Sequence, residues 1–243
     1  MSTQKLAIFD LDGTLFRWQL YYELELTLAR TGKLSESHTA QLLDAFHKWQ
    51  SREAHFHDFE AIALDIYVKT LPTLNTADFE AAVADVLAQS GHKVHHFTRT
   101  LAENLKKDGY FLLAISGSQQ EIAEPFARKY GFDDCIGWLY ERQGDHFTGE
   151  TLRVTVGNKH EHIRKYVEAH DFSLKDSIAI GDSGGDISML ELVDRPIAFN
   201  PNEDLLDASL EKGWEIVVER KNIAYTLQKG TDGHVILAKT DRF

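Results

Sequence analysis

The chain has 243 residues, with 26 Lys and Arg against 38 Asp and Glu, so its formal net charge is −12. Such an acidic chain lacks the broad basic face that binds nucleic acid or an anionic membrane, and we expect neither as a partner. The single cysteine, Cys135, excludes an intrachain disulfide and is typical of a reducing compartment such as the cytoplasm. The first residues become acidic too early for a signal peptide, and no apolar run approaches the roughly 18 residues of a membrane span.

Short apolar runs separated by amphipathic segments predict a parallel sheet covered by helices. Runs that are apolar almost throughout are typical of strands buried on both faces. The predicted strands are Leu6–Phe9, Tyr110–Ile115, Ser177–Ile180 and Trp214–Val218. The predicted helices between them are His92–Lys107, Gln119–Tyr130 and His160–Ala169. This alternation predicts a doubly wound, Rossmann-like α/β domain.

Residues 16–91 contain no good strand and form an insertion with helical periodicity. Its predicted helices are Trp18–Arg30, Ser37–Gln50, Phe56–Lys69 and Ala77–Gln89. We therefore predict a core domain of residues 1–15 and 92–243 and an all-helical domain of residues 16–91. Within the predicted core, residues 136–156 indicate a β-hairpin with a Gly-Asp turn, and Val235–Leu237 an added edge strand.

Two carboxylates follow the first predicted strand directly. Asp10 and Asp12 are two residues apart, so an extended backbone directs both to one side, and Gly13 permits the turn that follows. The carboxyl edge of a parallel sheet is where α/β folds bind ligands. Two acids placed there repel each other, which favours either a bound cation or a shared proton.

Three further segments lie just after a strand or open the next helix. Ser116 and Gly117 end the second strand, Lys159 opens a helix, and Asp182 and Asp186 lie in a glycine-rich turn. Each segment alone also fits an ordinary turn, helix cap or surface residue. Together they bring acids, a hydroxyl group and a lysine to one sheet edge, which suits Mg²⁺ and a phosphoryl group.

In this order, the four segments resemble the motifs of the haloacid dehalogenase superfamily of aspartate-nucleophile phosphatases. The resemblance covers residues 10–186 in its motifs and extends to about Asn200. The helical insertion is similar to the first-type cap of that family, and residues 157–199 are most similar to its phosphoserine-phosphatase-like branch. The resemblance implies a magnesium-dependent phosphatase that acts on a small phosphomonoester.

The resemblance also implies a role for each motif residue. Asp10 is the nucleophile and Asp12 the general acid and base, while Ser116, Gly117 and Lys159 bind the phosphoryl group. The metal ligands are Asp10, Asp12 through its backbone carbonyl, and Asp182, and Asp186 positions Lys159 or a metal-bound water.

The insertion departs from phosphoserine phosphatases, which carry a glutamate nine residues after the nucleophile. Gln19 occupies that position here, so we expect a substrate other than phosphoserine. The candidate specificity residues are Arg17, Trp18, Gln19, Tyr22 and Arg52. The motifs fit a phosphotransferase or mutase equally well, and a phosphometabolite sensor is a further alternative. The sequence leaves open the oligomeric state and the role of residues 214–243.

Overall fold

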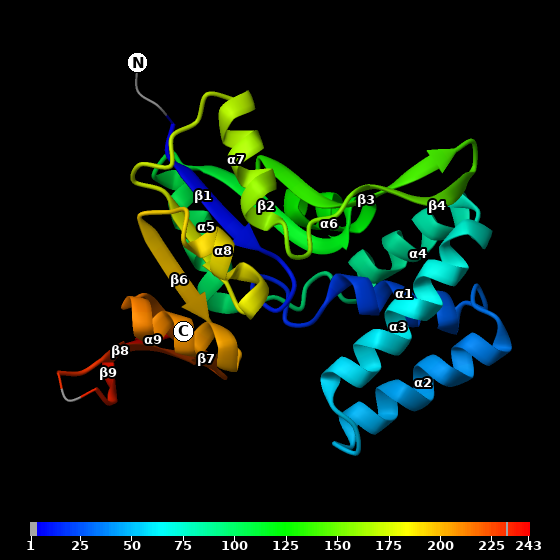
Figure 1. Ribbon diagram of the computed structural model, residues 1–243, viewed down its shortest axis with the longest axis horizontal. Coiled ribbons are helices and arrows are strands. Elements are labelled where there is room, and N and C mark those ends of the chain that lie inside the picture. The colour runs from blue at the N-terminus through cyan, green and yellow to red at the C-terminus, as the bar shows by residue number, and fades with distance from the viewer. Residues whose placement is uncertain (1–3, 232) are drawn as a thin grey trace. The chain divides into compact units, whose positions relative to one another are not determined.

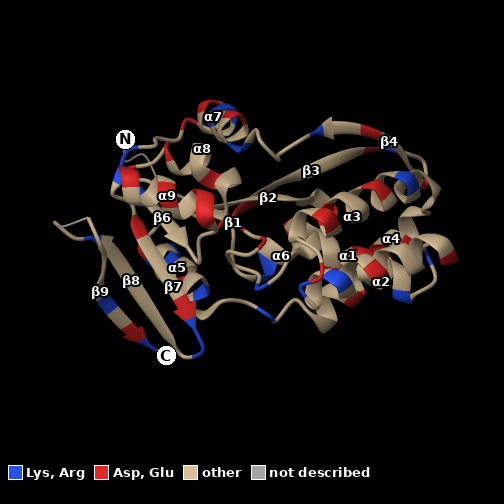
Figure 2. Cartoon of the chain, turned by 60° about the horizontal axis from the view of Figure 1, so that its bottom comes forward, with Lys and Arg blue, Asp and Glu red and all other residues tan. Residues whose placement is uncertain are grey.

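The computed structural model describes residues 4–231 and 233–243, which divide into two compact units. Unit 1 contains residues 1–18, 93–138 and 154–243, and unit 2 contains residues 19–92 and 139–153. The helices and strands are labelled in Figure 1, and β3 (Asp134–Gln143) contributes its first half to unit 1 and its second half to unit 2. Acidic residues lie on helices of both units, with fewer Lys and Arg residues among them (Figure 2).

Unit 1 is a twisted, mostly parallel sheet with the strand order β3-β2-β1-β5-β6-β7-β8-β9. The strands are β1 (Leu6–Asp10), β2 (Phe111–Gln119), β3 (Asp134–Gln143), β5 (Ile178–Gly181), β6 (Arg195–Phe199), β7 (Glu215–Arg220), β8 (Ile223–Lys229) and β9 (Val235–Arg242). The pairs from β3 to β7 are parallel, whereas β8 and β9 are added antiparallel at one edge. The predicted doubly wound fold is thereby confirmed, with an antiparallel extension.

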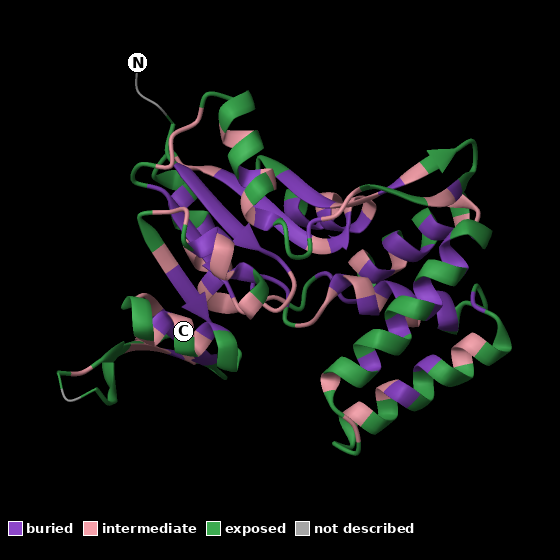
Figure 3. Ribbon diagram, in the orientation of Figure 1, coloured by how far each residue is buried: buried purple, intermediate pink, exposed green. Residues whose placement is uncertain are grey.

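Helices cover both faces of this sheet because neighbouring strand residues point to opposite sides. On one face of the sheet, Ile8 belongs to a hydrophobic core with Ile163 of α7 and Leu205 of α9. On the opposite face, the ring of Phe9 packs edge-on against that of Phe132. The central strands are almost entirely buried (Figure 3). The helices are α5 (His96–Lys107), α6 (Gln120–Lys129), α7 (Lys159–Ala169), the short η2 (Gly184–Asp186), α8 (Ile187–Leu190) and α9 (Glu203–Lys212).

Unit 2 consists of helices and a β-hairpin. Its helices are α1 (Leu20–Arg30), α2 (Glu36–Gln50), α3 (Phe56–Thr70), η1 (Leu71–Thr73) and α4 (Thr76–Gln89). They follow the predicted helical segments, with ends that differ by one or two residues. The second half of β3 pairs with β4 (His146–Arg153) as the predicted hairpin.

The hairpin belongs to unit 2 and not to the core domain in which the sequence placed it. Phe147 of β4 packs edge-on against Phe79 of α4, with ring centroids 5.0 Å apart. Arg142 pairs with Glu80 at 3.0 Å, and the Thr76 N–H donates to the Asp145 carbonyl at 2.7 Å. These contacts bury the inner face of the hairpin against the helices of residues 16–91, which are helical as predicted.

The part of the chain that the structure describes includes none of the long, apolar helices needed to cross a membrane.

The C-terminal strands hold the start of α5 in place through Glu219 of β7. Its side chain is only 2% exposed and accepts hydrogen bonds from the backbone N–H groups of His96 (3.2 Å) and Phe97 (2.8 Å). His95 Nδ1 and Arg17 Nη2 also contact it, at 3.3 and 3.4 Å. Burial raises the pKa of Glu219, but the hydrogen bonds from His95 and the two N–H groups outweigh it and lower the pKa to about 2.

Glu219→Gln should therefore destabilise the fold. Losing charge-assisted bonds to buried donors should cost about 1–3 kcal/mol of unfolding free energy at pH 7. Because the folded pKa is depressed, this stabilisation is present above the ordinary value of 4.5 and is lost as the pH falls towards 2. Urea unfolding of wild type and variant at pH 7 and pH 3 measures both effects.

Glu215→Gln is the matched control. Glu215 lies on the same strand and pairs with Arg195 at 3.0 Å, but that arginine is half exposed. Such a surface pair contributes about 0–1 kcal/mol. Equal losses in the two variants would contradict the role given to Glu219.

Candidate active site

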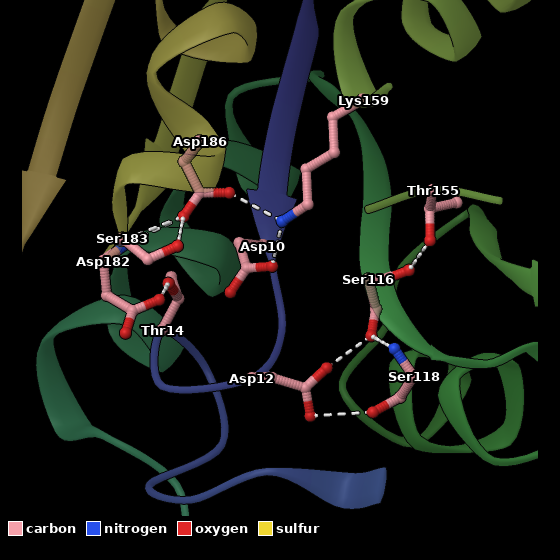
Figure 4. A network of polar contacts seen from close by, with 10 residues as sticks. All are labelled: Asp10, Asp12, Thr14, Ser116, Ser118, Thr155, Lys159, Asp182, Ser183 and Asp186. Atoms are coloured by element: carbon pink, nitrogen blue, oxygen red, sulfur yellow. Dashed lines mark hydrogen bonds and ion pairs between the residues drawn. The ribbon is translucent and has the colours of Figure 1, made fainter. Parts of the chain in front are cut away.

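Asp10 ends β1, the strand at which the sheet changes its winding direction. It lies between β2 and β5, the position where open α/β sheets bind ligands. Its side chain is buried, and Oδ1 accepts a hydrogen bond from Lys159 Nζ at 2.5 Å (Figure 4). The other oxygen, Oδ2, is buried and has no hydrogen-bond partner among the described residues. One oxygen of Asp10 is thus fixed, and the second is left for a ligand.

Lys159 is the first residue of α7, and it bridges two acids from different segments. Its buried ammonium group donates to Asp10 and, at 2.6 Å, to Asp186 Oδ1. Burial alone lowers the pKa of Lys159, but the charges and hydrogen bonds of the two acids outweigh it and hold the pKa above its usual range. The lysine is therefore a permanent cation in the site.

Asp186 and Asp182 lie in the glycine-rich turn after β5. Asp186 Oδ2 accepts from the N–H groups of Asp182 and Ser183, both at 3.1 Å, and from the Ser183 hydroxyl at 3.2 Å. Both oxygens of Asp186 are therefore already engaged within the protein. Asp182 Oδ1 accepts from the Thr14 hydroxyl at 3.1 Å.

Asp12 faces the C-terminal end of β2. The hydroxyl group of Ser116 donates to Asp12 Oδ2, and that of Ser118 donates to Asp12 Oδ1 at 3.0 Å. The Ser118 N–H in turn donates to Ser116 Oγ at 2.8 Å, and the Thr155 hydroxyl donates to the Ser116 carbonyl at 2.6 Å. Asp12 and Asp10 thus have different environments, although they are two residues apart.

The site holds more negative charge than Lys159 neutralises. One oxygen each from Asp10, Asp182 and Asp186 lie within 4.8 Å of one another. Burial raises the pKa of Asp10 well above its usual value; Lys159 opposes this, and Asp186 and Asp182 add to it. Burial, followed by the charge of Asp186, raises the pKa of Asp182 to about 7. A cation with oxygen ligands fits this donor set, in which Oδ2 of Asp10 has no hydrogen-bond partner among the described residues.

Two glycines are required by the close packing of these acids. Gly13 has a φ of +85°, and a Cβ there would lie 2.2 Å from Asp182 Oδ2. A Cβ on Gly181 would lie 2.5 Å from the Cβ and Cγ of Asp186. The glycines of both motifs therefore leave space for a neighbouring carboxylate.

The structure places motif residues of the sequence analysis in two hydrogen-bonded groups, one around Lys159 and one around Asp12 (Figure 4). Ser116 lies inside β2 and not after it, because β2 continues to Gln119 beyond an irregularity in its pairing with β3. Sequence reasoning missed Ser118, Thr14 and Thr155, which hold Asp12, Asp182 and Ser116. The sequence Ser116-Gly117-Ser118 could have pointed to Ser118, because it follows the predicted Ser116 by two residues. Thr155 lies 39 residues from Ser116 in the chain, so no local sequence pattern indicates their contact.

The five predicted specificity residues are divided between the units. Arg17 and Trp18 belong to unit 1, where Arg17 reaches Glu219 and the Trp18 carbonyl accepts from the Gly13 N–H at 2.9 Å. Gln19 precedes α1, Tyr22 is buried in unit 2 with its hydroxyl on Glu60, and Arg52 lies in the turn after α2 with a φ of +63°. The pairing of Arg17 with Glu219 gives this residue a structural contact that the sequence did not indicate.

A family model of haloacid dehalogenase-like hydrolases matches residues 7–191. The chain belongs to this family. The phosphoserine phosphatase SerB1 of Mycobacterium tuberculosis is 28% identical over 151 residues, which cover 61% of this chain and 47% of that protein. The chain thus spans about half the length of the first curated relatives that it matches.

Other proteins match this chain over nearly its whole length. The histidinol-phosphatase of Neisseria meningitidis is 25% identical over 235 residues, covering 88% of this chain and 98% of that protein. A Bordetella pertussis protein of unknown function has a TM-score of 0.74 and is 22% identical, covering 88% of this chain and 98% of that one. A phosphoserine phosphatase structure has a TM-score of 0.60 at 20% identity, covering 90% and 95% of the two chains. These two structures share the fold.

Gly181→Ala should disrupt the acid–lysine network of this family member. The new methyl group would displace Asp186 and with it Lys159, at an expected cost of about 1–3 kcal/mol of unfolding free energy. Gly185→Ala is the matched control, since its Cβ would make only an ordinary 3.5 Å contact with Ser183 Oγ. Urea unfolding measures the difference, and equal stability of the two variants would contradict the packing argument.

Proposed function

We propose that this protein is a magnesium-dependent phosphomonoester hydrolase that acts on a small cytoplasmic phosphometabolite through an aspartyl-phosphate on Asp10. The observation that carries the proposal is the buried Asp10 carboxylate, held by Lys159 through one oxygen and left without a partner at the other. A carboxylate fixed in this way is a preorganised nucleophile. Membership of the hydrolase family supports this chemistry.

Asp10, Asp182 and the backbone carbonyl of Asp12 are the groups that would hold Mg²⁺. Asp186 contributes to the acidic cluster, but its oxygens are engaged by Lys159, Ser183 and backbone N–H groups, so it would support the site from behind. When bound, the ion supplies positive charge that offsets repulsion between the acids and an anionic substrate and orients the phosphoryl group.

The reaction then consists of two displacements at phosphorus. In the first, an oxygen of Asp10 bonds to phosphorus, the bond to the leaving oxygen breaks, and Asp12 gives that oxygen its proton. In the second, Asp12 takes a proton from water, the water oxygen bonds to phosphorus, and the bond to Asp10 breaks. Asp12 therefore alternates between acid and base.

Ser116, Gly117 and Lys159 would bind the phosphoryl oxygens. Ser116 donates to Asp12 in this structure, and we expect a phosphoryl oxygen to replace Asp12 as its acceptor. That exchange would release Asp12 to face the leaving group. The charge of Lys159 and the Gly117 N–H would stabilise the negative charge of the transferring group.

The relatives suggest which substrates to test first. Relatives are named phosphoserine phosphatase and histidinol-phosphatase, and the latter matches this chain over nearly its whole length. Both names imply an ester of an amino alcohol. Gln19 stands where phosphoserine phosphatases carry a glutamate. Phosphoserine is therefore a less favoured substrate than histidinol phosphate.

Asp10→Asn should abolish phosphate release, because an amide does not form the acyl-phosphate. The test uses histidinol phosphate, phosphoserine and p-nitrophenyl phosphate with Mg²⁺, with EDTA and with the variant. A hydroxylamine-sensitive phosphate label should appear on the wild type and be absent from the variant. Wild-type rates in Asp10→Asn would refute the nucleophile. Transfer to added alcohols in preference to water would instead indicate a phosphotransferase, and tight binding without turnover a sensor.

Asp12→Asn should lower kcat by about 10²–10⁴-fold for an alkyl phosphate, since general acid–base catalysis contributes that much. The step that forms the aspartyl-phosphate should be affected far less for p-nitrophenyl phosphate, because nitrophenolate leaves without a proton. Rapid-quench measurement of the first turnover with each ester makes the comparison. Equal losses in that step for both esters would contradict the acid role of Asp12.

A further inference from the structure

The hydroxyl group of Ser118 contacts the side chain of Asp12 and has no part in the two displacements described above. It donates to Asp12 Oδ1 at 3.0 Å, while the Ser116 hydroxyl donates to Asp12 Oδ2 (Figure 4). Ser118 is only 2% exposed, so its hydrogen bond is shielded from bulk water. Each oxygen of the Asp12 carboxylate therefore has a serine donor of its own.

An irregularity in β2 brings both serines to Asp12. From Ile115 to Gln119 β2 advances four residues, while the paired strand β3 advances only two. Irregularities of this kind often lie next to active sites and change the direction of side chains. Ser116 and Ser118 both lie in this stretch, and their hydroxyl groups reach the same carboxylate. These two serines and Asp12 all belong to unit 1.

Ser116 can change its acceptor without moving its oxygen. The Ser118 N–H donates to Ser116 Oγ at 2.8 Å, and the Thr155 hydroxyl donates to the Ser116 carbonyl at 2.6 Å. These bonds hold the oxygen and the backbone of Ser116, whereas its hydroxyl hydrogen rotates to suit the acceptor. When a phosphoryl oxygen replaces Asp12 as that acceptor, Asp12 Oδ2 loses its donor and Oδ1 keeps Ser118.

We propose that Ser118 is a positioning residue that makes Oδ2 the oxygen of Asp12 that carries the transferred proton. In a protonated carboxyl group one oxygen becomes a donor, and the other keeps its full capacity as an acceptor. The Ser118 hydroxyl engages Oδ1 as an acceptor, which leaves the proton to Oδ2. Oδ2 is also the oxygen beside Ser116, which would bind the phosphoryl group. This inference rests on the proposed phosphatase function and deepens it.

The same oxygen would then serve in both displacements. In the first, the proton on Oδ2 passes to the leaving oxygen as the bond between that oxygen and phosphorus breaks, and Asp12 becomes a carboxylate. In the second, Oδ2 takes a proton from the attacking water. Without the bond to Ser118, the carboxyl group of Asp12 turns about its Cβ–Cγ bond, and the proton is no longer held in line for transfer.

Two other roles for Ser118 predict different kinetics. If its hydroxyl group bound the phosphoryl group in the ground state, its removal would raise KM and leave kcat unchanged. If it only filled space, its removal would lower stability and slow every step alike. A residue that positions Asp12 affects kcat, and only the steps in which Asp12 moves a proton.

The first test is Ser118→Ala with Mg²⁺. For histidinol phosphate and phosphoserine, kcat should fall by about 10- to 100-fold, the value of a hydrogen bond to a charged group, with KM within about twofold. With p-nitrophenyl phosphate the aspartyl-phosphate should form at the wild-type rate, because nitrophenolate leaves without a proton. Its hydrolysis still needs Asp12, so the hydroxylamine-sensitive label should accumulate. A raised KM with unchanged kcat, or equal slowing of both steps, would overturn the inference.

The second test asks whether Ser118 acts through Asp12. Ser118→Ala should lower kcat no further in a protein that already carries Asp12→Asn, because interacting residues give non-additive losses. Ser118→Thr keeps a hydroxyl group and should retain most of the wild-type kcat. Additive losses in the double variant, or a Ser118→Thr protein that melts like the wild type and is as slow as Ser118→Ala, would overturn the inference.

Ser209→Ala is the matched control. Ser209 is buried in α9 of the same unit, and its hydroxyl group donates to the Leu205 carbonyl at 2.6 Å. The substitution removes a buried hydroxyl group that is not bonded to Asp12, so kcat should be unchanged. Accumulation of the label in this variant as well would contradict the role of Ser118. Wild-type kinetics in Ser118→Ala would refute that role alone, whereas no hydrolysis of any of the three esters by the wild type would refute the phosphatase and this inference with it.

Discussion

The buried ammonium group of Lys159 joins the end of β1, the start of α7 and the turn after β5. It donates to Asp10 and Asp186, which are separated from it by 149 and 27 residues. Removing one partner of such a buried network leaves uncompensated charge, which is far more costly than losing a surface pair. The charge is nevertheless unbalanced, since one lysine faces Asp10, Asp182 and Asp186. The same network that fixes the strand ends therefore creates the demand for a further cation.

The glycines make this density of charged groups sterically feasible. Gly13 and Gly181 belong to different motifs, yet each would place a Cβ against a carboxylate of the turn after β5. The motif residues are thus coupled by packing as well as by charge. The carboxylates of Asp182 and Asp186 leave no room for a Cβ at Gly13 and Gly181. A glycine is therefore needed at each strand end where one of these acids packs against the backbone.

Strand ends were predictable from sequence because their signals are local. A continuous apolar run, followed by an acid and a glycine, marks a buried strand and the loop that leaves it, as at Phe9–Gly13 and Ile180–Asp182. The assignment of the hairpin failed because its partner is defined only in three dimensions. Phe147 contacts Phe79 across 68 residues, and a phenylalanine in a polar hairpin does not reveal which domain it packs against. Strand β6 was not predicted, because it begins with Arg195-Pro196 and its apolar run is too short to indicate a buried strand.

Two buried glutamates show why a residue type alone does not define a role. Glu219 receives hydrogen bonds from backbone N–H groups and His95, and its pKa falls to about 2. Glu25 receives none from the described residues, and its pKa rises to about 9. Burial raises the pKa of both glutamates, so the hydrogen-bond donors around Glu219 account for the difference between them. The fold has satisfied Glu219 by itself, which makes that residue structural. Around Glu25 no such donors are found among the described residues, so burial alone sets the pKa of that carboxyl.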